Sequence, residues 1–100
     1  METFTVDKES AKRAKATISD PLAEKKWPKF EMSVADNPFY HPKHRRIVKL
    51  EKGTGFPPGT YRYSDNPLRV VYYPNKETHT VYPLAAGTAT NIPYKKKSKK

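Results

Sequence analysis

The feature that most constrains the fold is a pair of β-prone runs separated by a short polar turn. The runs are Leu68 to Tyr73 and Thr78 to Tyr82, and both are rich in aliphatic and aromatic residues, as strands are. Between them, Pro74-Asn75-Lys76-Glu77 has turn chemistry, because proline presets φ and asparagine tolerates turn geometry. We therefore predict a β-hairpin over residues 68–82 that closes with Tyr73 opposite Thr78.

This register divides the hairpin into two faces, since side chains alternate along a strand. The face that we expect to be mostly apolar carries Leu68, Val70, Tyr72, His79 and Val81. The face that we expect to be aromatic and polar carries Arg69, Val71, Tyr73, Thr78, Thr80 and Tyr82. A slip of the pairing by one residue would exchange the two faces.

Two further short strands are expected before the hairpin, near residues 47–51 and 60–64, which gives an antiparallel meander of three or four strands. Two short helices are expected near the N-terminus. The first spans residues 7–18, with Asp7 as its cap and an i,i+4 pair between Glu9 and Arg13, although a solvated or disordered segment remains an alternative. The second begins at Ser19 or Asp20, has Pro21 in its first turn, and ends before Pro28.

Hydrophobic residues make up only 35% of the 100 residues, and ten residues are proline. Because ordering each backbone residue costs roughly 1–2 kcal/mol, we expect only residues of about 44–84 to fold alone and the rest to order on a partner. The predicted fold class is therefore mostly irregular, with a small antiparallel β unit, one or two short N-terminal helices and an extended basic tail. The predicted divisions are an arm over 1–44, a β meander over 45–84 and a lysine-rich tail over 85–100.

The net charge of +10 is the strongest global property of the sequence. Five lysines lie in the last six residues, so the remainder still carries +5. A chain with this charge is expected to attract nucleic acid or an acidic protein. Aromatic residues are interleaved with lysine and arginine in "KKWPKF" and "FYHPKHRR", a mixture that suits both base stacking and protein interfaces.

No motif of an enzyme or of a metal site is recognisable in the sequence. The chain has no cysteine, which excludes disulfides and thiolate metal sites. His41 and His44 have Pro42 between them, and no third ligand stands nearby, so we expect no metal site. No nucleophile motif, phosphate loop or dinucleotide fingerprint is present. We therefore predict no enzymatic activity, no cofactor and no membrane span, and the absence of a signal sequence favours an intracellular or virion-interior location.

These observations predict a non-catalytic structural subunit of a large assembly, bound to an acidic surface. Structured RNA is the favoured surface, as in a ribosome-like particle, and several protein neighbours are expected. The alternative is a component of a protein lattice, such as the microtubule wall, a minor capsid protein or an accessory subunit of an organellar complex.

The sequence also suggests which residues would carry these contacts. The residues predicted to bind the polyanion are Lys12, Arg13, Lys15, Arg45, Arg46, Lys95, Lys96, Lys97, Lys99 and Lys100. The residues predicted to act as interface and packing anchors are Trp27, Phe39, Tyr40, Tyr61 and Tyr72. For Trp27, packing in a core or an interface is the first interpretation and base stacking the second.

Overall fold

The computed structural model of this chain describes residues 3–39, 47–50 and 56–88. Within these residues the chain forms a five-stranded sheet and three short helices. In chain order the elements are β1 (Thr5–Val6), α1 (Lys8–Lys15), α2 (Pro21–Lys25), α3 (Trp27–Asp36), β2 (Ile47–Lys49), β3 (Tyr61–Asp65), β4 (Leu68–Asn75) and β5 (Thr80–Gly87).

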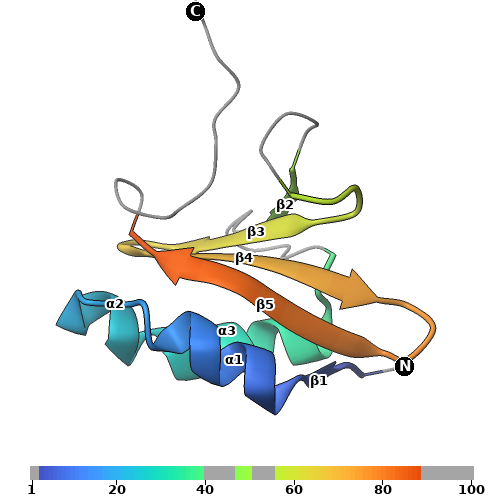
Figure 1. Cartoon of the computed structure of the whole chain (residues 1–100), viewed down its shortest axis with the longest axis horizontal. Coiled ribbons are helices and arrows are strands. Elements are labelled where there is room, and N and C mark those ends of the chain that lie inside the picture. Colours follow the sequence, from blue (N-terminus) through green and yellow to red (C-terminus); the bar gives the residue numbers. More distant parts are fainter. Residues whose placement is uncertain (1–2, 40–46, 51–55, 89–100) are drawn as a thin grey trace, which may run out of the picture.

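The helices lie together on one face of the sheet, so the molecule has two layers (Figure 1). The strand order is β1-β5-β4-β3-β2. β1 runs parallel to β5, with Thr5 beside Thr80 and Val6 beside Val81, and the other three pairs are antiparallel. In the part of the chain that the structure describes, no helix covers the opposite face of the sheet, which we call the open face.

This architecture contradicts the predicted fold class. The sheet is mixed and five-stranded, and three helices pack against it, where we predicted a mostly irregular chain with a small hairpin unit. We expected the extended tail to start at residue 85, but β5 continues through Gly87. The division into 1–44, 45–84 and 85–100 stays a prediction, although β5 runs across its second boundary.

The hairpin exists, but its register differs from the predicted one. Tyr73 pairs with Tyr82 and Asn75 with Thr80, so the turn occupies residues 76–79. The turn therefore lies two residues later than predicted, and the partner of Tyr73 changes by four residues, from Thr78 to Tyr82. Because this shift is even, the paired residues next to the turn stay on their predicted faces, whereas Thr78 and His79 lie in the turn and a bulge between Val71 and Tyr72 changes the shift further along the strands. Leu68, Val70, Tyr72 and Val81 are accordingly buried. The turn differs because His79 adopts a positive φ of 53° and Asn75 accepts hydrogen bonds from the backbone of Glu77 and Thr78.

The caps of the first two helices are confirmed. Asp7 precedes α1 and accepts a 2.9 Å hydrogen bond from the backbone N–H of Ser10, which lowers the pKa of the Asp7 carboxyl. Arg13 pairs with Glu9 at 3.4 Å. Asp20 caps α2, with Pro21 in the first turn.

The third helix was not expected, because the sequence analysis placed no helix in the arm after Pro28. α3 spans Trp27–Asp36, and Pro28 lies in its first turn. A proline there loses no hydrogen bond, because the first N–H groups of a helix have no partner within it. Pro28 therefore lies in the first turn of a helix, whereas we predicted that a helix ends before it.

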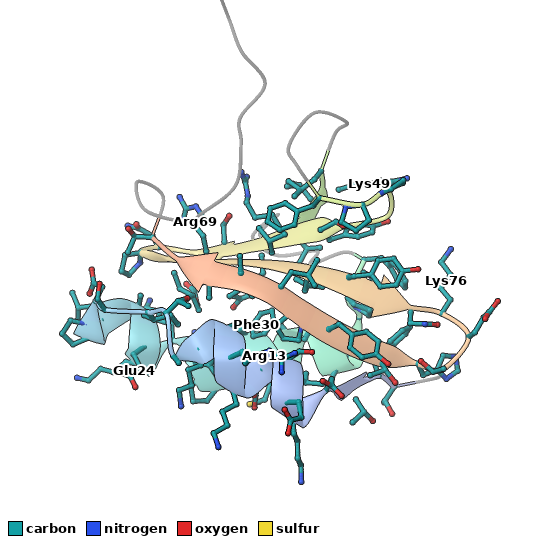
Figure 2. All side chains as sticks on the ribbon, in the orientation of Figure 1. Arg13, Glu24, Phe30, Lys49, Arg69 and Lys76 are labelled. Atoms are coloured by element: carbon teal, nitrogen blue, oxygen red, sulfur yellow. The ribbon has the colours of Figure 1, made fainter. Side chains whose placement is uncertain are left out.

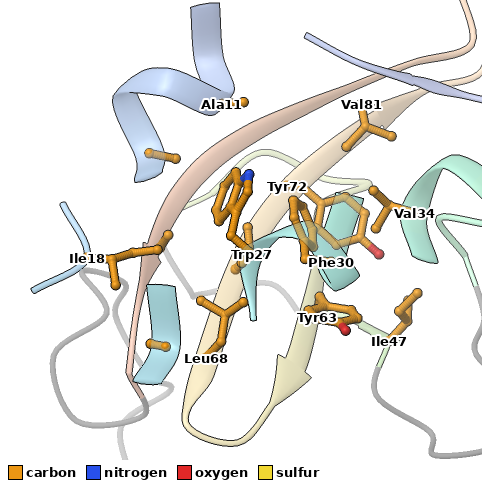
Figure 3. Close-up of a cluster of buried hydrophobic side chains, with 14 residues drawn as sticks. Ala11, Ile18, Trp27, Phe30, Val34, Ile47, Tyr63, Leu68, Tyr72 and Val81 are labelled. Atoms are coloured by element: carbon orange, nitrogen blue, oxygen red, sulfur yellow. The ribbon is translucent and has the colours of Figure 1, made fainter. Parts of the chain in front are cut away.

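The core lies between the two layers and is centred on aromatic rings (Figure 3). Phe30 of α3 packs against Trp27, Tyr63 and Tyr72, with ring centroids 4.9, 5.2 and 5.7 Å away. Phe30, Tyr63 and Tyr72 are fully buried. Because the helical segment supplies Ala11, Ala14, Ile18, Ala23, Trp27, Phe30 and Val34 to the same cluster as the strands, the expectation that the N-terminal region orders only on a partner does not agree with this packing.

The hydroxyl of Tyr72 ties the sheet to the chain after α3. It donates a 2.6 Å hydrogen bond to the carbonyl of Pro38, which is itself buried. Burial raises the pKa of Tyr72 far above its ordinary value. Among the described residues, no helix is both long enough and apolar enough to cross a bilayer.

Candidate functional site

The open face carries the side chains that alternate with the buried ones. On β3 and β4 these are Arg62, Ser64, Arg69, Val71 and Tyr73, because Tyr63, Leu68, Val70 and Tyr72 point into the core. Figure 2 shows the same division: Phe30 lies between the layers, whereas Arg69 projects away from the helices.

Two arginines and a serine form the centre of this face. Ser64 of β3 lies directly opposite Arg69 of β4, and Arg62 lies opposite Val71. Arg62 and Arg69 are therefore diagonal neighbours, with Cβ atoms about 7 Å apart. Both side chains are half-buried. Half-buried guanidinium groups at this separation can bind two oxygens of one phosphate.

The hydroxyl of Ser64 lies between the two arginines and is buried. Within the described residues it has no hydrogen-bonding partner. Buried hydroxyls are nearly always paired in folded proteins, and leaving one unpaired costs about 1–3 kcal/mol. A ligand oxygen held by the arginines would lie where it could accept a hydrogen bond from this hydroxyl.

The charge that the described strands place on the open face is positive. Among the described strands, the only carboxylate is Asp65, and its side chain lies on the helix side. There it accepts a hydrogen bond from Tyr63 and forms a 3.5 Å ion pair with Lys26. Asp65 therefore does not neutralise Arg62 or Arg69, and the strands present positive charge on the open face.

Aromatic and apolar side chains accompany these cations. Tyr73 and Tyr82 are paired across β4 and β5. Val71 and Ala85 form a small cluster with Leu50 and Phe56, which lie outside the strands. The open face thus combines guanidinium groups with rings, the combination that single-stranded nucleic acid requires of a binding surface.

The predicted site residues fall in different places. Lys12, Arg13 and Lys15 are exposed on α1 in the helix layer, away from the open face. Tyr40, Arg45, Arg46, Lys95, Lys96, Lys97, Lys99 and Lys100 lie outside the described residues. Trp27 and Tyr72 pack within the core, while Phe39 and Tyr61 are half-buried. Their roles in binding stay predictions.

The sequence analysis missed Arg62 and Arg69 as site residues. In the sequence, each arginine stands between two residues of a strand that are apolar or aromatic, so both were recognisable as residues of the opposite strand face. Their proximity depends on the pairing of β3 with β4, which places residues seven apart in the chain on one patch. His79, which we expected on the apolar face of the hairpin, lies in the turn, and its imidazole packs 5.1 Å from the ring of Phe4. No cluster of three or more potential metal ligands occurs among the described residues.

No protein-family model matches this sequence, and no curated protein does either. Solved structures do share the fold. The toxin–antitoxin complex RelBE2 of Mycobacterium tuberculosis has a chain with a TM-score of 0.63 and 19% identity, over 86% of this chain and 98% of that one. A free-state, double arginine-to-alanine variant of the Escherichia coli toxin RelE gives 0.56 and 21%, over 89% and 85%. The archaeal RelE–RelB complex of Pyrococcus horikoshii gives 0.57 and 20%, over 90% and 97%.

These likenesses show a shared fold, and they overturn the predicted role. A fold shared with RelE toxins contradicts both the non-catalytic subunit on structured RNA and the protein-lattice alternative. The prediction of no enzymatic activity is contradicted for the same reason. The partner prediction is also wrong, because two of these structures are complexes of RelE with RelB type proteins and none is a large acidic assembly.

Proposed function

We propose that this chain is the toxin of a toxin–antitoxin pair and that it cleaves RNA on its open face. The observation that carries the proposal is the cluster of Arg62, Ser64 and Arg69 on a face whose strands present no carboxylate in the described part of the chain. The fold shared with RelE toxins supports it independently.

The chemistry that suits this cluster is transesterification within the RNA strand. The 2′-hydroxyl attacks the adjacent phosphorus and loses its proton, the bond from phosphorus to the 5′-oxygen breaks, and that oxygen takes up a proton. The products are a 2′,3′-cyclic phosphate and a 5′-hydroxyl, and the reaction consumes no other reactant. Negative charge grows on the phosphoryl oxygens during the attack. Arg62 and Arg69 bind those oxygens, and preorganised donors of this kind stabilise the transition state more than the ground state.

The test compares two double variants that lose the same charge. Arg62→Gln/Arg69→Gln removes both guanidinium groups, while Lys25→Gln/Lys29→Gln removes two exposed charges from the helix layer. Removing one donor to a developing oxyanion typically lowers kcat about 10²- to 10³-fold. We therefore expect at least a 100-fold loss of kcat in the first variant and little change in the second. Mass spectrometry of the fragments should show the cyclic phosphate.

The assay needs two arms, free single-stranded RNA and RNA engaged on ribosomes, because a chain of charge +10 is attracted to both. Cleavage in either arm that depends on the two arginines supports the proposal. A folded wild-type chain that cleaves RNA in neither arm refutes it, and so does an equal loss of activity in the two double variants.

The partner we propose is a small antitoxin that is acidic where it meets this chain. Two of the similar structures are complexes of this kind, and the charge of this chain favours an acidic surface. Purification of the endogenous protein should recover a small protein in fixed stoichiometry that survives nuclease treatment. Recovery of the chain alone, or of nuclease-sensitive material only, would contradict this partner.

A further inference from the structure

A hollow of about 340 Å³ opens at one end of the sheet, where β2 ends, β3 begins and β4 ends. This volume lies at the lower end of the range for small-ligand sites, roughly 300–1,000 Å³, and suits part of a nucleotide. Its lining combines cations, rings and an amide, which come from Phe39, Lys49, Tyr61, Tyr73, Asn75 and Lys76. The rise along a strand places Asn75 about 20 Å from Arg69, so the hollow is distinct from the arginine cluster.

Two exposed lysines stand at this end of the molecule. Figure 2 shows Lys49 and Lys76 at the same end of the sheet, with Arg69 at the other end. Among the described residues that line the hollow, Glu77 is the only acid, so these residues carry a net positive charge. Lys76 also places its Nζ 5.4 Å from the centroid of the Phe39 ring. A phosphate bound by the lysines would therefore lie beside an aromatic ring.

The rings of the hollow are held in place by the fold. Phe39 packs edge-on against Tyr61 and Phe4, with centroids 5.4 and 5.7 Å away. Tyr73 lies against Gly59, whose φ is +86° and at which a Cβ atom would come within 3.4 Å of the tyrosine ring. Rings fixed in this way lose little entropy when a base stacks on them.

Asn75 supplies a directed hydrogen-bond donor. Its Oδ1 accepts from the backbone N–H groups of Glu77 and Thr78, at 2.9 and 3.1 Å. Because these bonds occupy the carbonyl end of the amide, the group that Asn75 offers to a ligand is the N–H donor pair of its amide Nδ2. A nucleobase presents suitable acceptors in its carbonyl oxygens and ring nitrogens.

We propose that this hollow is a nucleotide subsite, which binds one base and its phosphate on the same RNA strand, a few nucleotides from the phosphate held by Arg62 and Arg69. Lys49 and Lys76 bind the phosphate, the base stacks on the ring lining, and Asn75 donates to the base. The inference rests on the proposed function, and it extends the RNA contact along β4 from the arginine cluster to the hairpin turn.

The test measures the binding of a 2′-O-methyl RNA, which the proposed reaction cannot cleave. Fluorescence anisotropy is recorded over a salt series for wild type, Lys49→Gln/Lys76→Gln and the matched Lys25→Gln/Lys29→Gln. Each lost phosphate contact reduces the slope of log K against log salt by about 0.7 for single strands. We expect a reduction of about 0.7 in the first variant, since the two lysines share one phosphate, and no change in the second. Removing one base along the RNA should weaken wild-type binding about tenfold at a single position.

Activity provides a second readout. Substrate contacts away from the reacting atoms raise KM and leave kcat unchanged, so Lys49→Gln/Lys76→Gln should raise KM alone, unlike Arg62→Gln/Arg69→Gln. If wild type binds RNA and depends on the arginines, but the two lysine variants behave alike, the subsite is refuted and the proposed function stands. If wild type binds no RNA, both fail. A Lys49→Gln/Lys76→Gln variant that loses affinity only for an acidic protein partner also refutes the subsite.

Discussion

Replacing Tyr72 with phenylalanine tests how the sheet is attached to the chain that follows α3. The side chain is fully buried, and its hydroxyl donates to the buried carbonyl of Pro38 at 2.6 Å. Phenylalanine fills the same space but leaves that carbonyl without its donor. A buried polar group without a partner costs about 1–3 kcal/mol. For a domain of this size a loss of about 2 kcal/mol lowers Tm by roughly 8–16 °C.

The same substitution changes how stability depends on alkaline pH. The pKa of Tyr72 is raised in the folded protein, because burial penalises the phenolate. A raised pKa in the fold means that the unfolded chain releases its proton first, near its ordinary pKa of about 10. The contribution is therefore complete below pH 10 and is lost as pH rises above it, at about 1.4 kcal/mol per pH unit. Tyr72→Phe removes this slope.

The assay is urea denaturation followed by circular dichroism at several pH values from 7 to 11. Tyr82→Phe is the control, because Tyr82 is half-buried on the open face and its substitution should change the free energy of unfolding by no more than about 0.5 kcal/mol. Equal stabilities of the two variants at pH 7 would refute the role of the bond to Pro38. An unchanged alkaline slope in Tyr72→Phe would refute the argument from burial.

Substitutions at three further positions test the helices and the core. Phe30→Ala should lower the free energy of unfolding by about 3–5 kcal/mol in urea denaturation, because the ring is fully buried among Trp27, Tyr63 and Tyr72; a loss below 1 kcal/mol would contradict the core. Asp20→Ala should cost about 0.5–2 kcal/mol by loss of the α2 cap, and Asp20→Asn should restore most of it. The pKa of Asp7 is lowered in the fold, so its contribution is present above its ordinary pKa of about 3.8 and is lost as pH falls below it. Asp7→Asn should therefore flatten the acid limb of stability against pH, and an unchanged limb would refute the cap.

Several features of the fold were predictable because they depend on neighbours in the chain. Asp7 and Asp20 were recognisable as caps, since a cap needs only its own helix. The two faces of the hairpin were predicted correctly even with the wrong register, because alternation along a strand is local and an even shift preserves it. The register itself depends on the turn, and His79 with positive φ was not a recognisable turn signal.

The sequence by itself determined the caps of the first two helices, which strand face is apolar and how strongly positive the chain is. Only the tertiary structure decided that Pro28 begins a helix, that β1 joins β5, and that Arg62 and Arg69 share one phosphate-sized patch. The pairing of β1 with β5 and that of β3 with β4 depend on contacts across strands, which the pattern within a single strand does not show. The low apolar content was misleading for the same reason: the rings of Trp27, Phe30, Tyr63 and Tyr72 form a core only when α3 packs on the sheet.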